Sequence, residues 1–167
     1  MRAFFLLGLV GLLLSGCSNY RLGTSGQLAF RTLYVAPVVN ESNLPQAVAI
    51  VSTRLREEFL NDPRIILVNT AEEADATLTV SLTNYSRQSQ TRQLVDTGLS
   101  RKFDVTLDAE ATLRDNRDNK LIFENRKVQA VRQAYVDSGQ LQSEYQNVPL
   151  LAETLAKNIR AAALDVW

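Results

Sequence analysis

The sequence predicts an α+β fold, a two-layer sandwich in which two helices cover one face of a four-stranded, mostly antiparallel mixed sheet. Several segments alternate apolar and polar residues, which is typical of strands with one buried face. Two other segments repeat apolar residues every three or four positions, as amphipathic helices do. These elements follow one another in the order β-α-β-β-β-α. Elements that each have one apolar face pack stably as one sheet against one helical layer.

The first strand and the first helix are predicted between residues 30 and 61. Residues 30–38 are rich in β-forming side chains, and Asn40–Asn43 is a turn and helix-start signal. Pro45 follows in the first helical turn, where a missing N–H is tolerated. The helix is expected to end at Asn61-Asp62-Pro63. Its apolar stripe consists of Leu44, Val48, Val51, Leu55 and Phe59. A helical crossover makes the first strand parallel to the next one.

Three antiparallel strands are predicted next. Residues 64–68 form a short apolar run and residues 71–75 a turn or bulge, before clear alternation begins at Ala76. The third strand is expected over residues 103–113, and a polar turn at Asp115–Asn119 leads into the fourth. In the fourth strand the apolar positions change from odd to even numbers, which predicts a β-bulge between Glu124 and Lys127. The positions concerned are Leu121, Phe123, Val128, Ala130 and Ala134.

The last helix is predicted to follow a loop over residues 137–146. Asn147 is expected to cap it, and Pro149 to lie in its first turn. Its apolar stripe consists of Leu151, Leu155, Ile159, Ala162 and Val166. Strand directions place the start of the domain and the Asp115–Asn119 turn at one end of the sheet. The loops over residues 39–44, 86–100 and 137–146 are expected at the other end.

The N-terminus has the pattern of a bacterial lipoprotein signal peptide. Arg2 precedes an apolar stretch, and Leu14-Ser15-Gly16 leads into Cys17, the one cysteine of the chain. We therefore predict cleavage after residue 16 and acylation of Cys17 with diacylglyceryl and palmitate-type chains, which anchor the protein in a membrane. Ser18 stands where an Asp would signal inner-membrane retention, so we expect the periplasmic face of the outer membrane. Residues 17–29 are predicted to be a lipidated tether and residues 30–167 one domain. The alternative is an ordinary signal peptide with an incidental cysteine.

The composition argues against several classes of function. The chain has no histidine, which removes the commonest general base and metal ligand. Its 18 basic and 18 acidic residues are balanced, which argues against nucleic-acid binding. Asp104, Asp108 and Glu110 are predicted on the outer face of the sheet, where they could resemble a cation site. A flat sheet without histidine nevertheless leads us to expect no enzyme, no metal and no cofactor. That outer face could be simply solvated or could pack against another polar surface.

Basic residues gather around the long loop between the second and third strands. They are Arg87, Arg92, Arg101 and Lys102, with Asp96 the one acidic residue among them, and Arg132 is expected near the same end of the sheet. Guanidinium groups bind phosphate oxygens in pairs, so these five residues are candidate contacts for a phosphorylated ligand. The alternative is a solubilising loop whose charges bind nothing.

Several short motifs occur together with this element order. They are the lipobox ending at Cys17, Tyr20-Arg21-Leu22, the strand at Phe30–Pro37, the stretch Asn40–Pro45 and the sequence Ala74-Asp75-Ala76. With these motifs the mature chain resembles the LPS-assembly lipoprotein family. The resemblance implies a non-enzymatic plug of the outer-membrane lipopolysaccharide translocon, with a large β-barrel protein as partner and lipopolysaccharide contact during transfer. Two alternatives remain open: an adaptor lipoprotein of another secretion or lipid-trafficking complex with the same fold, and a free glycan-binding module.

Overall fold

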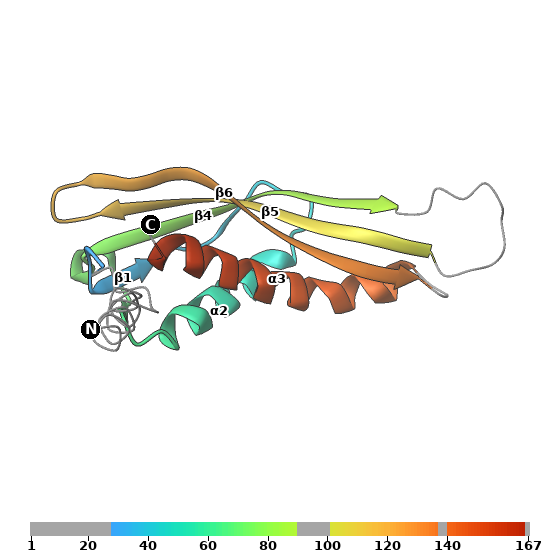
Figure 1. The fold of residues 1–167 in the computed structure, drawn as a ribbon, viewed down its shortest axis with the longest axis horizontal. Coiled ribbons are helices and arrows are strands. Elements are labelled where there is room, and N and C mark those ends of the chain that lie inside the picture. Colours follow the sequence, from blue (N-terminus) through green and yellow to red (C-terminus); the bar gives the residue numbers. More distant parts are fainter. Residues whose placement is uncertain (1–27, 90–100, 137–139, 166–167) are drawn as a thin grey trace, which may run out of the picture.

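The computed structural model describes residues 28–89, 101–136 and 140–165. A six-stranded sheet forms one layer, and both long helices lie on the same face of it (Figure 1). The strands are β1 (Thr32–Val35), β2 (Val39–Asn40), β3 (Ile66–Val68), β4 (Ala76–Ser89), β5 (Arg101–Asp115) and β6 (Lys120–Val136). The helices are α2 (Ala47–Leu60), the 3₁₀ turn η1 (Ala71–Glu73) and α3 (Gln140–Leu164). Within the described ranges, no helix is both long and apolar enough to cross a membrane.

The sheet is mixed, as the sequence predicts, but it has more strands than expected. The strand order is β3-β1-β4-β5-β6, with β2 beside β4. β1 is parallel to β3 and β4, whereas β4, β5 and β6 are antiparallel to one another. The prediction of four strands is wrong for two reasons. Pro37 cannot donate to a ladder, so the predicted strand over residues 30–38 is reduced to β1, and β2 forms at Val39–Asn40, where a loop is predicted. The apolar run before η1 forms β3, which is too short to show any alternation.

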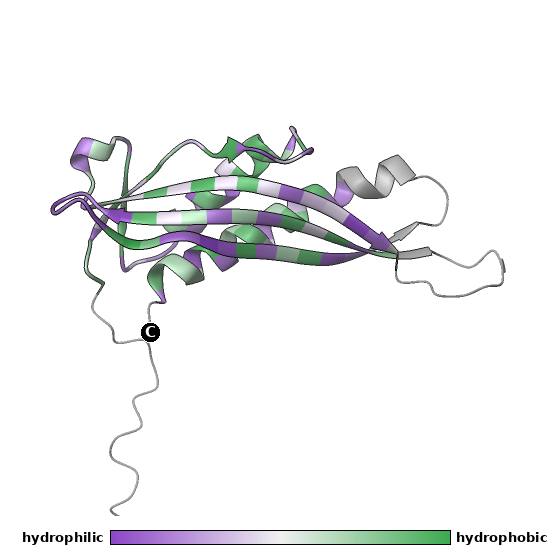
Figure 2. Cartoon of the chain, turned by 90° about the horizontal axis from the view of Figure 1, so that it is seen from above, coloured by the Kyte–Doolittle hydropathy of each residue, from purple (hydrophilic) through white to green (hydrophobic). Residues whose placement is uncertain are grey.

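The core lies between the sheet and the two helices. Alternate residues of the strands point into it, and hydropathy alternates along the long strands accordingly (Figure 2). The predicted helical stripes are confirmed at Val51, Leu55 and Phe59 of α2 and at Leu151, Leu155 and Ile159 of α3, which are fully buried. Val48 and Ala162 are only partly buried, and Val166 lies outside the described residues. The strands contribute Leu33, Leu78, Val80, Leu82, Leu107 and Leu113, each also fully buried.

The β-bulge predicted in the last strand is confirmed. Ala111 pairs with Arg126, but Leu113 pairs with Phe123, so β6 contains an extra residue at Glu124–Asn125. Asn125 has a positive φ of 47°, and its backbone N–H donates to the Thr112 hydroxyl at 3.1 Å. Asn tolerates this left-handed conformation better than most residues. The bulge therefore places Phe123 on the same face as Val128, Ala130 and Ala134. Leu121 does not join them, because a further register shift pairs it with the exposed Arg114.

A second bulge, in β4, is not predicted by the sequence. The register shifts between Leu82 and Asn84, which leaves Thr83 as the extra residue. Beyond it, odd-numbered residues take the helix-facing positions: Tyr85 pairs with Leu107, and Arg87 pairs with Val105. Directly paired residues of an antiparallel sheet lie on the same face. The bulge therefore places Arg87 on the helix-covered face of the sheet.

The last helix begins earlier than predicted. Gln140 is its first residue, so the expected loop over residues 137–146 is wrong from 140 onward, and Asn147 is not a cap. Pro149 lies inside the helix, although an internal Pro removes one backbone hydrogen bond and is generally unfavourable. The sequence interpretation assigned Pro149 to a first turn for that reason. Residues 137–139 lie outside the described part of the chain.

The two ends of the long strands differ in the elements that they hold. We call proximal the end with Leu28, Ala29 and the turn before Lys120, and distal the end with Ser89, Arg101 and Val136. The Arg117 guanidinium donates to the Ala29 carbonyl at 2.6 Å, which places the first described residues beside this turn. The expected distal position of residues 39–44 is wrong. β2 pairs with Ser81 and Leu82, near the middle of β4, because β2 continues directly from β1.

Candidate functional site

Two of the predicted basic residues form one row across the distal end. Arg87 on β4 and Arg132 on β6 both pair with Val105 on β5. They therefore lie on the same, helix-covered face and flank Val105, whose side chain is fully buried. Adjacent strands are separated by about 4.8 Å, so the two backbones are about 10 Å apart. Two arginines on strands at this spacing could contact two anionic groups of one ligand.

An aromatic ring supports one side of this row. The Arg87 guanidinium lies over the ring of Phe103, at 5.2 Å from its centroid. Phe103 pairs with Ala134 in the neighbouring row, so it lies on the same face as Arg132. This cation–π contact holds the Arg87 guanidinium beside the ring.

The remaining predicted site residues are described in part or not at all. Arg101 and Lys102 begin β5 and pair with Val136 and Tyr135, so both lie in the distal end as predicted. Their side chains lie outside the described part of the structure. Arg92 lies in the range 90–100 and Cys17 in the range 1–27, and neither range is described. Their predicted roles in ligand binding and lipidation stay predictions.

The row of guanidinium groups lies near charged residues of α3. Glu153 pairs with Lys157 at 2.6 Å, and this hydrogen bond is the main cause that lowers the pKa of the Glu153 carboxyl. The charges of Arg54 and Arg132 lower the same pKa further. Glu153 therefore lies within electrostatic range of Arg132 in the basic row.

The outer face of the sheet is polar. Asp108 accepts a hydrogen bond from the Asn84 amide at 3.0 Å, and Glu110 pairs across the strands with Lys127. A shallow hollow of about 470 Å³ lies here, open to solvent. Thr83, Asn84, Asp108, Ala109, Glu110, Lys127, Val128 and Gln129 line it. Among the described residues, no group of three or more His, Cys, Asp and Glu could hold a metal ion.

The proximal end is tied together by a second set of polar contacts. The Asp75 carboxylate accepts hydrogen bonds from the backbone N–H groups of Arg31 and Thr32, both at 2.9 Å. Those two bonds are the main cause that lowers the pKa of Asp75. Asp115 pairs with Arg117, whose hydrogen bonds lower the pKa of Asp115 from 3.8 to about 2. Because Arg117 also holds the Ala29 carbonyl, the chain enters the domain through a fixed position.

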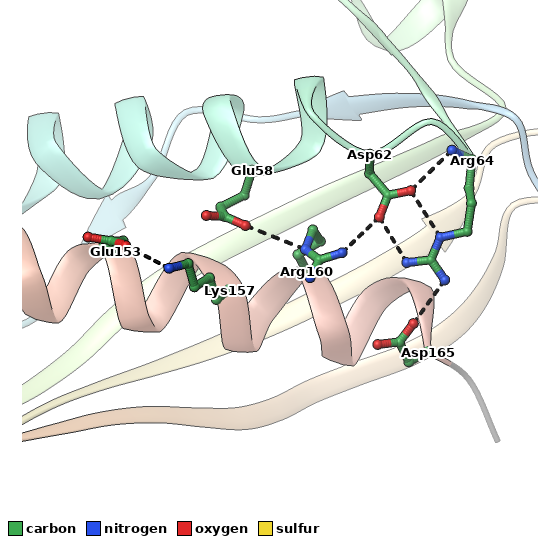
Figure 3. A network of polar contacts seen from close by, with 7 residues as sticks. All are labelled: Glu58, Asp62, Arg64, Glu153, Lys157, Arg160 and Asp165. Atoms are coloured by element: carbon green, nitrogen blue, oxygen red, sulfur yellow. Dashed lines mark hydrogen bonds and ion pairs between the residues drawn. The ribbon is translucent and has the colours of Figure 1, made fainter. Parts of the chain in front are cut away.

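A network of ion pairs connects the C-terminal ends of both helices (Figure 3). Its centre is Asp62, which lies just after α2 and is only 5% exposed. The Asp62 carboxylate accepts hydrogen bonds from Arg64 at 2.8 and 2.9 Å and from Arg160 of α3 at 2.8 Å. The Arg64 bonds are the main cause that holds the pKa of Asp62 well below its usual range. Arg64 also contacts Asp165 at 2.9 Å.

Sequence reasoning did not identify this network. The sequence Asn61-Asp62-Pro63-Arg64 was interpreted only as a helix stop, although an acidic residue two positions before an arginine can pair with it locally. The partner Arg160 is 98 residues away, and no local signal connects the two positions. The network fixes the packing of α2 against α3 and lies away from the distal basic row, so we regard it as structural.

Comparisons with known proteins agree with this fold. The chain is similar to protein XCC0632 of Xanthomonas campestris, with a TM-score of 0.57, 12% identity, and coverage of 83% of this chain and 86% of that one. It is also similar to the hypothetical protein CT253 of Chlamydia trachomatis, with a TM-score of 0.50, 13% identity, and coverage of 80% and 95%. At these identities the similarity concerns the fold alone. Among curated proteins, none matches this chain.

The sequence also matches a protein family over most of its length. The match covers residues 30–163, which include every described strand and nearly all of α3. The family is LptE, described by the words lipopolysaccharide-assembly. This agrees with the family that the short motifs and the element order suggest. The chain therefore belongs to the LptE lipopolysaccharide-assembly family.

Proposed function

We propose that this protein is an outer-membrane lipoprotein that plugs a lipopolysaccharide-translocating β-barrel and assists its assembly, and that it contacts lipopolysaccharide through its distal end. The family match over residues 30–163 is the observation on which this proposal mainly rests. In this proposal the protein is anchored through Cys17 on the periplasmic face and catalyses no reaction. The role would be performed by surfaces that contact another molecule.

The separation of the two ends of the sheet supports this assignment. The described chain starts at the proximal end, where Arg117 holds Ala29. The basic row of Arg87 and Arg132 lies at the opposite end of the same long strands. A lipid anchor on the proximal side would therefore direct the basic row away from the anchored membrane surface. A phosphorylated glycolipid that moves through the barrel would meet that row.

The outer face of the sheet supports a barrel partner. The outward positions of β4 and β5 are polar, chiefly threonine, serine, aspartate and glutamate. None of the large exposed apolar residues of the described chain lies on either strand. The lumen of an outer-membrane barrel is polar, so a polar face can pack there without burying unpaired apolar surface. A purely solvated face would have the same composition, which is why the partner must be identified by experiment.

The test is a cross-linking and copurification experiment on the full-length protein in its native membranes. We expect one large β-barrel protein as the dominant partner. Cys17→Ser should release the protein from the membrane fraction, since the acyl chains could not be attached. A dominant partner from another secretion or lipid-trafficking complex would favour the adaptor alternative and contradict the proposal.

Lipopolysaccharide contact needs its own test with matched variants. We expect the double variant Arg87→Ala, Arg132→Ala to bind purified lipopolysaccharide about tenfold or more weakly, as loss of charged hydrogen bonds predicts. Arg114→Ala is the control: Arg114 is exposed, contacts Asn119 at 2.8 Å and lies at the proximal end. Equal binding by the double variant and the control would show that the assignment of the distal row is wrong, even if the barrel partner is confirmed.

A further inference from the structure

Among the described strands, β6 pairs with β5 alone and leaves one edge of the sheet open, and the structure indicates which of its backbone groups face outward. The Asn158 side chain of α3 donates to the Gln129 carbonyl at 2.8 Å, so the Gln129 backbone faces away from β5. Backbone groups alternate in direction along a strand, so those of Val131 and Gln133 also face the open edge. Those of Arg132 and Ala134 face β5 and belong to the ladder.

The other side of the sheet gives the same assignment independently. The Glu41 N–H donates to the Leu82 carbonyl at 2.8 Å, so Leu82 faces away from β5. Its partner Ala109 therefore directs its backbone groups toward β6, where it pairs with Val128. Val128 then faces β5, and the next residue, Gln129, faces outward. Two hydrogen bonds on opposite sides of the sheet thus give the same direction for the backbone N–H and C=O groups in this half of β6.

The two halves of this edge differ in their protection. The first half contains the bulge at Asn125 and two lysines, Lys120 and Lys127, and Asn158 covers it at Gln129. Bulges, lysines and covering elements are the usual means by which proteins block the edge of a sheet. The second half, residues 131–136, has an unbroken register with β5 and no Lys or Pro. Val131 is 48% exposed there.

We propose that residues 131–136 of β6 accept an extended strand from the partner protein, which continues the sheet. An extended polypeptide is the occupant that fits, because it alone presents N–H and C=O groups at the spacing of an open strand edge. The outward side chain of Val131 favours an apolar neighbour on the partner strand. Arg132 lies on the helix-covered face and favours an acidic side chain at the next position of the partner strand. This inference rests on the proposed function for the identity of the partner, the barrel protein.

Substitution by proline tests the edge without breaking the sheet. Val131→Pro removes an N–H that faces the open edge and makes no ladder bond with β5, and proline is tolerated at such edge positions. Val131→Ala is the matched control, since it removes the same side chain and keeps the N–H. We expect full-length Val131→Ala to copurify with the barrel protein nearly as the wild type does, and Val131→Pro to bind about tenfold more weakly. Gln133→Pro should behave like Val131→Pro, and it replaces that variant if Val131→Pro unfolds.

Amide hydrogen exchange gives a second readout on the unmodified protein. In the isolated protein, the amides of Val131 and Gln133 should exchange fast while that of Arg132 is protected. Binding of the barrel protein should slow the first two. Protection of Val131 and Gln133 in the isolated chain would show that a segment of this chain already covers the edge. Protection that depends on protein concentration would indicate a second copy. Either result would overturn the proposal.

The outcomes also separate this inference from the proposed function. If the wild type captures the barrel protein and Val131→Pro captures it equally well, the inference is wrong and the proposed function is unaffected. If the wild type captures no barrel protein, the proposed function is wrong, and the partner assigned to this edge is wrong with it.

Discussion

Replacing Asp62 by alanine removes the centre of the ion network between the helices. The Asp62 side chain is 3% exposed, and its carboxylate holds both Arg64 and Arg160. Removing one partner of a fully buried ion pair destabilises a protein by about 3–5 kcal/mol. Here the two guanidinium groups are 30% and 31% exposed, so water replaces part of the lost contact.

Each arginine also keeps a second carboxylate after this substitution. Arg64 retains Asp165 at 2.9 Å, and Arg160 retains Glu58 at 3.5 Å. We therefore expect Asp62→Ala to lower the free energy of unfolding by about 2–3 kcal/mol, below the value for a fully buried pair. For a domain of this size, that loss lowers the melting temperature by roughly 5–10 °C.

The assay is denaturant unfolding at neutral pH, followed by circular dichroism, with Glu153→Ala as the control. Glu153 and Lys157 form a similar short ion pair, but their side chains are 42% and 53% exposed. Water screens the charges of an exposed pair, so the control should change stability little. Asp62→Ala with a stability equal to that of the control would refute the reasoning that burial makes this network important.

Three further predictions concern stability. The pKa values of Asp62 and Asp115 are lowered in the folded state, so the stabilisation that these carboxylates give is complete above the unfolded pKa of 3.8. It is lost as the pH falls through the folded pKa, which is about 2 for Asp115. Asp115→Asn should therefore reduce the loss of stability at acid pH, as unfolding measured against pH can show. Asn125→Gly should change the free energy of unfolding by less than about 0.5 kcal/mol, whereas Asn125→Val should cost about 1–2 kcal/mol because φ is 47°; equal losses would contradict the bulge geometry. Leu155→Ala should cost about 2–5 kcal/mol and Leu150→Ala, at a 40% exposed position, much less, as thermal unfolding can measure.

The sequence predicted those parts of the fold that alternating hydropathy reveals. The bulge at Asn125 was predictable because apolar residues lie on both sides of it and change from odd to even positions. The bulge at Thr83 was not, because Asn84, Ser86 and Gln88 beyond it are all polar and give no sign of a change of face. β3 has three residues, too few to show a period.

The candidate site was predictable to a similar extent. Strand directions alone placed Arg87 and Arg132 at one end, and the structure brings both beside Val105. The face on which they lie depends on the Thr83 bulge and could not be derived from the sequence. The Asp62–Arg160 contact was also beyond prediction, because it depends on how α2 and α3 end beside each other.

The antiparallel strands are long compared with the thickness of a membrane. β6 has 17 residues, and at about 3.3 Å per residue it measures roughly 55 Å from end to end. The hydrocarbon layer of a bilayer is about 30 Å thick. If the proximal end lies at the inner leaflet with the strands along the membrane normal, Arg132 stands at the level of the opposite leaflet. One rigid hairpin could then connect both surfaces of the membrane without any change of conformation.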